Sequence, residues 1–399
     1  MKIRTITLLG MTLLGGTTAA QDRPRWFAKP RKDCPPATVM PWCAPESAVP
    51  PTSPTPSTPS QPAPAPSEPS LAQPPQSSFM EALASAGEAG TQPSASYSPG
   101  FFGDLLPSVI LTPVFIPENG FVGLMASPNP SQAGGIKIAE GDSPRPTNRL
   151  YYNYNFFGNV DVNTPANVLT NVLPRMQVHR HIIGFEKTLL DGDASVGLRL
   201  PFFSMGGGSV AYETGFVGDL SVITKYAIIN NQETGNVWSA GLILGTPTGG
   251  SPNPIANQGN QRPEQPRYRG VQIVPYTGYI LNFCCQRLYL QGFHSIAVPT
   301  ENEEPTFISN GFGLGYWLVR EPHADFIQGF VPTVEVHVNT PLNNFSASLI
   351  GQTLMRNSVN LTSGAYIVLP RSIIGGAVGV PLSWGPHRIE ALASWTLRF

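Results

Sequence analysis

Two histidines placed two residues apart are the first pattern in this sequence whose types and spacing could do chemistry. His179 and His181 fall on one face of a strand, because successive strand side chains alternate between faces, and two such imidazoles could share a metal ion. No third ligand accompanies them. His294 and Ser295 suggest a serine hydrolase, but adjacent strand residues point to opposite faces and cannot be catalytic partners. The glycines at 311–315 lie in a strand pattern without a following helix, which indicates close packing rather than a nucleotide loop.

The motifs that usually mark an enzyme are missing. The sequence contains no G-x-S-x-G, no P-loop and no H-E-x-x-H. We therefore expect no enzyme, no metal site and no cofactor. The net charge of -1 argues against a nucleic-acid partner, which requires a basic surface.

The stretch from Arg388 to Phe399 indicates that β-strands are the elements that position any functional residue. Read with a period of two, one face is apolar and carries Trp395, Leu397 and Phe399, whereas the other is largely polar. The pattern resembles the C-terminal strand of bacterial outer-membrane β-barrels, whose terminal Phe is part of the signal read by the barrel-assembly machinery. The resemblance implies that these three residues are an assembly signal and that outer-membrane lipid is a partner. An edge strand of a soluble sandwich is the alternative.

The pattern repeats along the chain. Charged residues make up only 12% of the sequence, and no apolar run reaches the ~18 residues of a membrane-spanning helix. Strands of about the length needed to cross a bilayer are predicted at 149–158, 176–189, 194–203, 216–229, 236–247, 268–281, 287–298, 307–319, 327–339, 359–369, 372–382 and 388–399. The predicted fold class is all-β: a transmembrane antiparallel up-and-down β-barrel of about 12 strands, with a disordered Pro-rich N-terminal segment.

The two faces of these strands predict different surroundings. Polar residues on one face are candidates for lining the lumen, namely Arg199, Asp219, Lys225, Glu335, His337, Glu390 and Arg398. Aromatic residues near strand ends are candidates for the interfacial girdles, namely Tyr151, Tyr152, Phe185, Tyr226, Trp238, Tyr316 and Trp395. An even strand count would put both ends of the barrel, 149–399, on the periplasmic side, with longer loops outside.

The residues before the barrel divide into three parts. Residues 1–20 have the charged start, short apolar core and small-residue end of a signal peptide. Residues 21–99 are a Pro/Ser/Ala-rich disordered periplasmic linker, in which 79–89 could form a short helix and 21–78 could contact cell-wall polymer. Residues 100–148 could be a plug inside the lumen, extra strands or a linker. These features predict the outer membrane of a Gram-negative type envelope, with a periplasmic N-terminal arm.

The four cysteines come as two close pairs. Cys34 and Cys43 bracket a Pro-rich stretch and favour a disulfide, whereas Cys284 and Cys285 are adjacent residues beside a predicted turn. The sequence leaves the disulfide status of both pairs open.

One hairpin, 213–249, resembles a family of outer-membrane proteins associated with phenol meta-pathway degradation and related to fatty-acid transporter barrels. The matching residues are Gly218-Asp219-Leu220, Lys225-Tyr226 and Gly245-Thr246-Pro247-Thr248-Gly249. The resemblance implies a porin-like channel for passive transport of small hydrophobic or aromatic solutes. The alternative is a structural or surface-attachment barrel tethered to the cell wall through the Pro-rich arm.

Overall fold

The structure is a computed structural model that describes the barrel and parts of the chain just before it. The described residues are 98–103, 106, 108–116, 121–128, 138–160, 176–206, 213–250, 270–284, 286–301, 304–343, 353–383 and 385–399. The predicted signal peptide, the linker up to residue 97 and the helix predicted at 79–89 lie outside them. Within the described ranges, no helix is long and apolar enough to cross a membrane.

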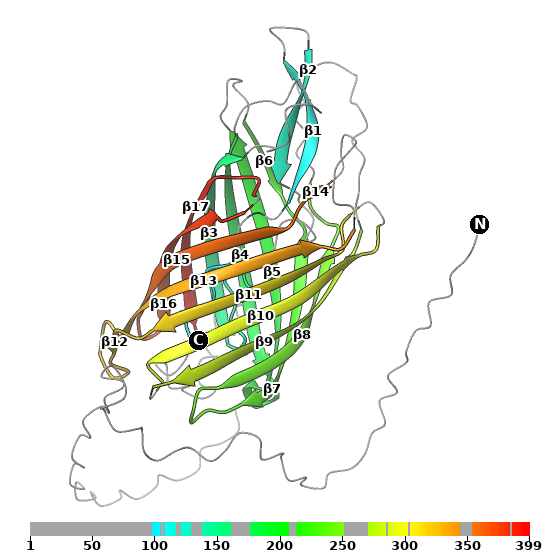
Figure 1. The fold of residues 1–399 in the computed structure, drawn as a ribbon. Coiled ribbons are helices and arrows are strands. Elements are labelled where there is room, and N and C mark those ends of the chain that lie inside the picture. The colour runs from blue at the N-terminus through cyan, green and yellow to red at the C-terminus, as the bar shows by residue number, and fades with distance from the viewer. Residues whose placement is uncertain are drawn as a thin grey trace, which may run out of the picture.

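Twelve antiparallel strands close into a barrel (Figure 1). The large sheet has 14 strands, but β6 (Glu213–Val217) and β12 (Val319–Arg320) pair only at its margins, with β5 and β13. The other strands form a ring because β11 pairs with both β10 and β13. Their bounds are β3 Arg149–Val160, β4 Met176–Leu189, β5 Ala194–Gly206, β7 Leu220–Asn230, β8 Val237–Thr246, β9 Gln272–Phe283, β10 Leu288–Pro299, β11 Phe307–Tyr316, β13 Gly329–Pro341, β15 Ser358–Val368, β16 Ser372–Pro381 and β17 Ile389–Arg398.

The barrel closes between β17 and β3, the last and first strands of the ring. Trp395 pairs with Tyr152, and Arg398 pairs with Arg149. Each predicted strand corresponds to one ring strand, and β4 has the predicted bounds. The prediction of an all-β antiparallel barrel is therefore confirmed.

Two predicted strands are interrupted in the structure. The strand predicted at 216–229 divides into β6 and β7 at Gly218 and Asp219, because the Asp219 carboxylate accepts a hydrogen bond from the Gly249 amide at 2.8 Å. The strand predicted at 307–319 ends at Tyr316. The Trp317 amide still donates to the Arg287 carbonyl at 2.8 Å, in register with the pairing of Leu288 and Tyr316. The register toward β13 then shifts by one residue at β12, where Val319 pairs with Phe330.

The two ends of the barrel have different connections. One end, which we call the short-turn end, carries the connections 190–193, 231–236, 284–287, 317–328 and 369–371. The other, the long-loop end, carries 161–175, 207–219, 247–271, 300–306, 342–357 and 382–388. This asymmetry is typical of outer-membrane barrels.

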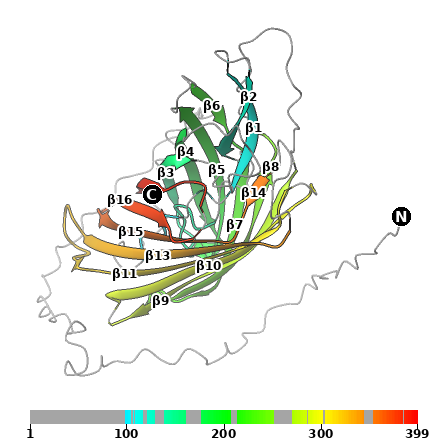
Figure 2. The same ribbon diagram turned by 45° about the horizontal axis from the view of Figure 1, so that its top comes forward.

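A separate three-stranded sheet lies at the long-loop end (Figures 1 and 2). It consists of β1 (Ser108–Ile116), β2 (Phe121–Pro128) and β14 (Thr353–Met355), with β1 in the centre. Because β14 belongs to the connection between β13 and β15, this sheet joins the segment before the barrel to one of its long loops.

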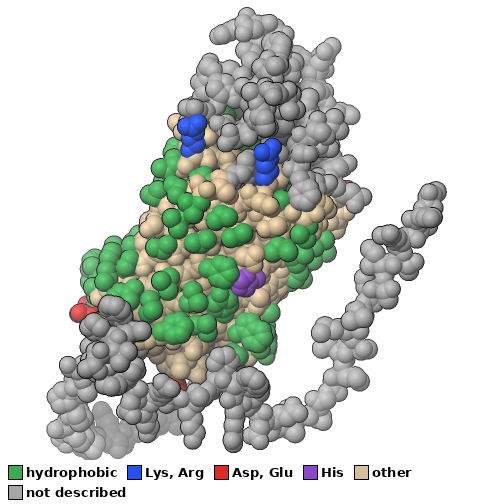
Figure 3. All heavy atoms as spheres, viewed as in Figure 1, with side chains coloured by type: hydrophobic (Ala, Val, Ile, Leu, Met, Phe, Trp, Pro, Cys, Tyr) green, Lys and Arg blue, Asp and Glu red, His purple; other side chains and the backbone are tan. Residues whose placement is uncertain are grey.

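Charged and apolar side chains are partitioned between the two faces of the wall. Among the described side chains of the ring strands, Lys187 near the end of β4 is the only Lys, Arg, Asp or Glu that points outward. The outward face carries large apolar side chains such as Ile183, Leu198 and Trp238, which are 46–48% exposed. Figure 3 shows this apolar surface over the visible side of the barrel. The prediction of Tyr151 as an interfacial aromatic is wrong, because its ring is buried on the inner face, against Gly184.

Candidate functional site in the barrel interior

Two stretches of chain from before the barrel lie inside it. Residues 98–103 with 106, and residues 138–148, contact the inner faces of the strands; we call them the inner segments. The Phe101 amide donates to the Asp142 carbonyl at 2.9 Å, which joins the two segments directly. The first described residue, Ser98, bonds to Gln291 near the short-turn end of β10, whereas β1 and β2 follow at the long-loop end. The chain therefore passes up through the interior, forms the outer sheet and returns.

The second inner segment, residues 138–148, which we call the descending segment, is held by a cluster of buried charges. The Lys225 Nζ atom lies 2.9 Å from Asp142 Oδ1 and 3.0 Å from Glu186 Oε1. Arg149 pairs with both carboxylates, and its Nε lies 2.7 Å from Glu186 Oε2. Arg199 lies 3.7 Å from the second Asp142 oxygen. Three wall cations thus surround one carboxylate of the inner segment. Their attraction to it is stronger in the buried interior than it would be in water.

This environment keeps Asp142 charged. Burial alone would raise the pKa of Asp142. The ammonium of Lys225 and the guanidinium groups of Arg149 and Arg199 outweigh this effect and lower the pKa to about 2. The Asp142 carboxylate therefore stabilises the docked segment fully at pH values above its ordinary pKa of 3.8. This contribution is lost as the pH falls toward 2. A second buried pair, Glu140 to Arg180 at 2.8 Å, reinforces the same segment.

The first inner segment, residues 98–103, which we call the ascending segment, is held by a carboxylate of the opposite wall. Glu335, fully buried on β13, accepts hydrogen bonds from the amides of Phe102 at 2.9 Å and Gly103 at 3.2 Å. His337 Nε2 lies 3.2 Å from the same carboxylate. On β10, the Gln291 amide donates to the Gly100 carbonyl at 2.8 Å. Backbone groups that would otherwise be buried without partners are thus satisfied by the wall.

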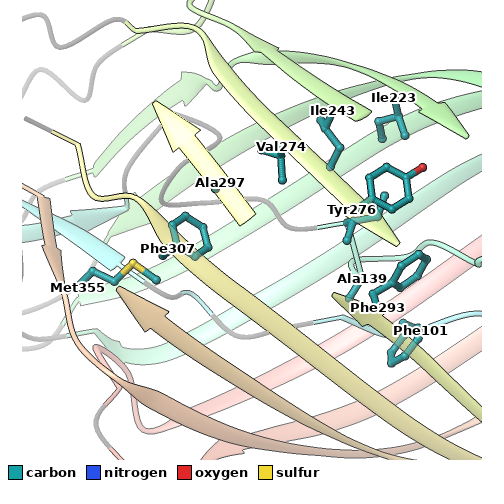
Figure 4. Packing of buried hydrophobic residues seen from close by; sticks show 11 residues of the cluster. Phe101, Ala139, Ile223, Ile243, Val274, Tyr276, Phe293, Ala297, Phe307 and Met355 are labelled. Carbon is teal, nitrogen blue, oxygen red and sulfur yellow. The ribbon is translucent and has the colours of Figure 1, made fainter. Parts of the chain in front are cut away.

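Apolar contacts complete the docking (Figure 4). Phe101 lies against Phe293, with ring centroids 5.4 Å apart, and belongs to a buried cluster with Ala139 and the wall residues Ile243 and Tyr276. The inner faces of two strands are nearly free of side chains where the segments pass. On β11 these positions are Gly311, Gly313 and Gly315, and on β16 they are Gly375, Ala377 and Gly379. The wall therefore has room for the inner segments.

The predicted lumen-lining residues occupy three kinds of position. Arg199, Lys225, Glu335 and His337 are buried and contact or lie next to the inner segments. Glu390 is buried on β17 and accepts a hydrogen bond from Asn155 at 2.6 Å.

The two remaining predicted lumen-lining residues, Asp219 and Arg398, lie toward the ends of the barrel. Asp219 holds the break between β6 and β7. Arg398 donates to the Leu369 carbonyl at 2.8 Å at the short-turn end.

Several interior residues escape prediction from the sequence. Arg149, Arg180 and Glu186 lie on the polar faces of strands whose alternation was recognisable, so the period of two could have found them. Glu140 and Asp142 lie in a segment without periodicity, and only the structure brings them to the wall.

The two histidines of the predicted strand 176–189 lie on its outer face, beside tyrosines. His179 and His181 point outward, and their Nδ1 atoms each lie 2.7 Å from a tyrosine hydroxyl, of Tyr154 and Tyr152 respectively. These bonds satisfy polar groups on an apolar surface. No cluster of three or more His, Cys, Asp or Glu that could hold a metal occurs among the described residues. Cys284 is disulfide-bonded, and the other three cysteines lie outside the described part of the chain.

No known protein family and no curated protein matches this sequence. Several solved bacterial barrels are similar to the structure. An outer membrane channel from Pseudomonas putida F1 is 13% identical, with a TM-score of 0.44 over 64% of this chain and 96% of that chain. The KdgM porin in complex with disordered oligogalacturonate is 9% identical, with a TM-score of 0.36 over 63% of this chain and 99% of that chain. LpxR from Salmonella typhimurium is 8% identical, with a TM-score of 0.40 over 63% of this chain and 100% of that chain.

Similarity at this level carries no argument about function. The resemblance of residues 213–249 to the phenol meta-pathway family also stays a prediction. The functional argument therefore rests on the geometry of the barrel itself.

Proposed function

We propose that this chain is an outer-membrane channel whose lumen is closed at rest by its own inner segments. The observation that carries the proposal is the partition of charge. Eight of the nine charged residues on the ring strands face inward, whereas the outward face is apolar. A charged side chain facing hydrocarbon is costly, and a closed barrel satisfies every backbone hydrogen bond, so this wall suits a bilayer. In this orientation the short-turn end and the N-terminal arm are periplasmic.

Passage through the barrel requires the inner segments to move. The charged cluster around Asp142 and the contacts of Glu335 hold both segments within the lumen. Polar and charged interiors exist in barrels that pass solutes, and a segment docked by hydrogen bonds and ion pairs can be released without unfolding the wall. The proposed solutes are small hydrophobic or aromatic compounds. Interior aromatic rings support this class, namely Tyr276, Tyr289, Phe293 and Tyr366.

Planar-bilayer recording tests the proposal. The chain with intact inner segments should show rare openings, whereas Phe101→Ser/Phe102→Ser/Glu140→Gln/Asp142→Asn should conduct steadily, because both segments lose their anchors. A matched control makes the same changes at two outward phenylalanines and two exposed turn carboxylates, as Phe312→Ser/Phe330→Ser/Asp191→Asn/Glu233→Gln. Equal, near-zero currents from both proteins, each correctly folded by heat-modifiable migration, would contradict a channel and favour a structural barrel tethered by the Pro-rich arm.

A further inference from the structure

One residue of the ascending segment occupies the wall as a small ligand would. The ring of Phe102 stacks on Tyr366, with centroids 4.1 Å apart and planes 8° apart. Its own amide donates to Glu335 at 2.9 Å. Within one residue, an aromatic ring and an N–H donor separated by two carbon atoms therefore meet a tyrosine ring and a carboxylate.

The wall is shaped around this ring. A Cβ atom added at Gly364 or at Gly375 would lie 2.7 Å from a carbon of the Phe102 ring, closer than real Cβ contacts come. The two glycines lie on the neighbouring strands β15 and β16 and form the floor of the site. We call this place, formed by Glu335, Gly364, Tyr366 and Gly375, the Phe102 seat.

Polar groups around the seat have unused hydrogen-bonding capacity. The hydroxyls of Thr333, Thr362 and Tyr366 are buried, and no partner for them lies within reach among the described residues. Thr362 pairs directly with Glu335 across the β13–β15 ladder, so the two share one face. Buried polar groups without partners are costly, which indicates that the site accommodates more polar groups than the segment supplies.

The charge of the seat is also unbalanced. Among the described residues, no Lys or Arg forms an ion pair with Glu335, and the ionisable side chain that contacts it is His337, whose Nε2 lies 3.2 Å away. Amide donors partly stabilise this carboxylate, but a cation would add a direct Coulomb attraction that an uncharged amide does not supply. A protonated amine therefore suits Glu335 better than the amide that now contacts it.

We infer that the Phe102 seat is a binding site for arylalkylamines, in which a flat ring is joined by about two carbons to a protonated amine. The ring takes the place of Phe102 against Tyr366 and the glycine floor, and the ammonium takes the place of the amide at Glu335. This inference rests on the proposed function, because it names the solute class that competes with the inner segment inside the channel.

Calorimetry on the full chain in detergent tests the site directly. Phe102→Pro removes both the ring and the N–H donor, and Phe102→Gly, which removes the ring alone, replaces it if the proline variant fails to assemble. The probe is 2-phenylethylamine, with 2-phenylethanol as the neutral ligand, 3-phenylpropionate as the anion and propylamine as the ligand without a ring. We expect the amine to bind the variant at least about tenfold more tightly than the unmodified chain, and about tenfold more tightly than each of the other three probes.

Two further substitutions separate specific recognition from nonspecific partition. Glu335→Gln in the same background should abolish the preference for the amine over the alcohol, and Tyr366→Leu should weaken both ligands that carry a ring. Equal binding of amine and alcohol, or a preference that survives Glu335→Gln, would overturn the inference. Conductance after release of the inner segments without amine binding would overturn the site and leave the channel standing. Amine binding without conductance would support the site and contradict the channel.

Discussion

At the scale of single residues, Asp142 is the group that fixes the inner segment to the wall. Its carboxylate contacts Lys225 at 2.9 Å, Arg149 and, at 3.7 Å, Arg199. Burying such a cluster stabilises the protein little by itself, but removing one member leaves uncompensated charges behind. The interior therefore depends on each partner being present.

Asp142→Asn should loosen the descending segment without unfolding the barrel. Loss of this buried charge costs about 3 kcal/mol, which corresponds to roughly 100-fold more frequent opening of the segment. Hydrogen–deuterium exchange of peptides that span 138–148 should accelerate accordingly. Asp191→Asn makes the same chemical change in an exposed turn and should leave the exchange unaltered. Unchanged exchange in Asp142→Asn would show that the cluster does not hold the segment.

The sequence predicts only one side of this cluster. Alternation along strands marks Lys225 and Arg199 as polar-face residues, because a period of two survives in each strand. Lys225 bonds to Asp142 across 83 residues, and Asp142 lies in a stretch with no regular period. Nothing local in the sequence encodes that pairing, which depends on where the ring of strands closes.

At the scale of elements, β17 combines the closing seam of the barrel with a sharply two-sided surface. Trp395 points outward and is 39% exposed, while its neighbour Thr396 faces the interior and pairs with Tyr151 and Ile373. The sequence predicted this strand and its two faces. The breaks after Val217 and Tyr316 were missed, because each depends on tertiary pairing: a hydrogen bond from the Gly249 amide to Asp219, and a one-residue shift in the register with β13.

Trp395→Lys should impair assembly into the membrane. A lysine on the lipid-facing side of a barrel costs about 2–4 kcal/mol at the bilayer midplane and about 0–1 kcal/mol near the interface, so a position toward the end of β17 should carry a cost between these values. A lysine at an interior position reaches water or polar groups. Thr396→Lys is the matched control and should assemble at nearly normal levels. Heat-modifiable migration of outer-membrane fractions measures both. Equal assembly of the two variants would mean that the outward face of β17 does not contact lipid. Deletion of Phe399, predicted to be part of the assembly signal, should lower the membrane level as well.

At the scale of the whole molecule, the topology assigns the two ends of the barrel to opposite sides of the membrane. Both ends of the ring, near Asn148 and Phe399, lie at the short-turn end, where the Phe399 amide contacts the Asn148 carbonyl at 3.4 Å. The separate sheet of β1, β2 and β14 lies at the other end. The even number of ring strands made the shared location of the two ends predictable, whereas for residues 100–148 the sequence left a plug, extra strands and a linker as alternatives.

Epitope insertion tests this orientation in cells. A tag placed in the 231–236 turn should be hidden from antibody until the outer membrane is permeabilised. The same tag placed between β8 and β9 should be accessible on intact cells. The reverse pattern would place the long-loop end in the periplasm and refute the proposed orientation.

The most direct test of the central claim locks the inner segment to the wall. The Cβ atom of Ala139 lies 3.7 Å from the position of a Cβ atom at Gly311, close to the separation of about 3.8 Å found in disulfides. In the Asp142→Asn background, Ala139→Cys/Gly311→Cys should conduct little when oxidised and should recover the current of Asp142→Asn upon reduction. Asp142→Asn alone should not respond to the reductant. Equal current from the oxidised and reduced double-cysteine protein, with the disulfide verified by mass spectrometry, would contradict closure of the lumen by the inner segments.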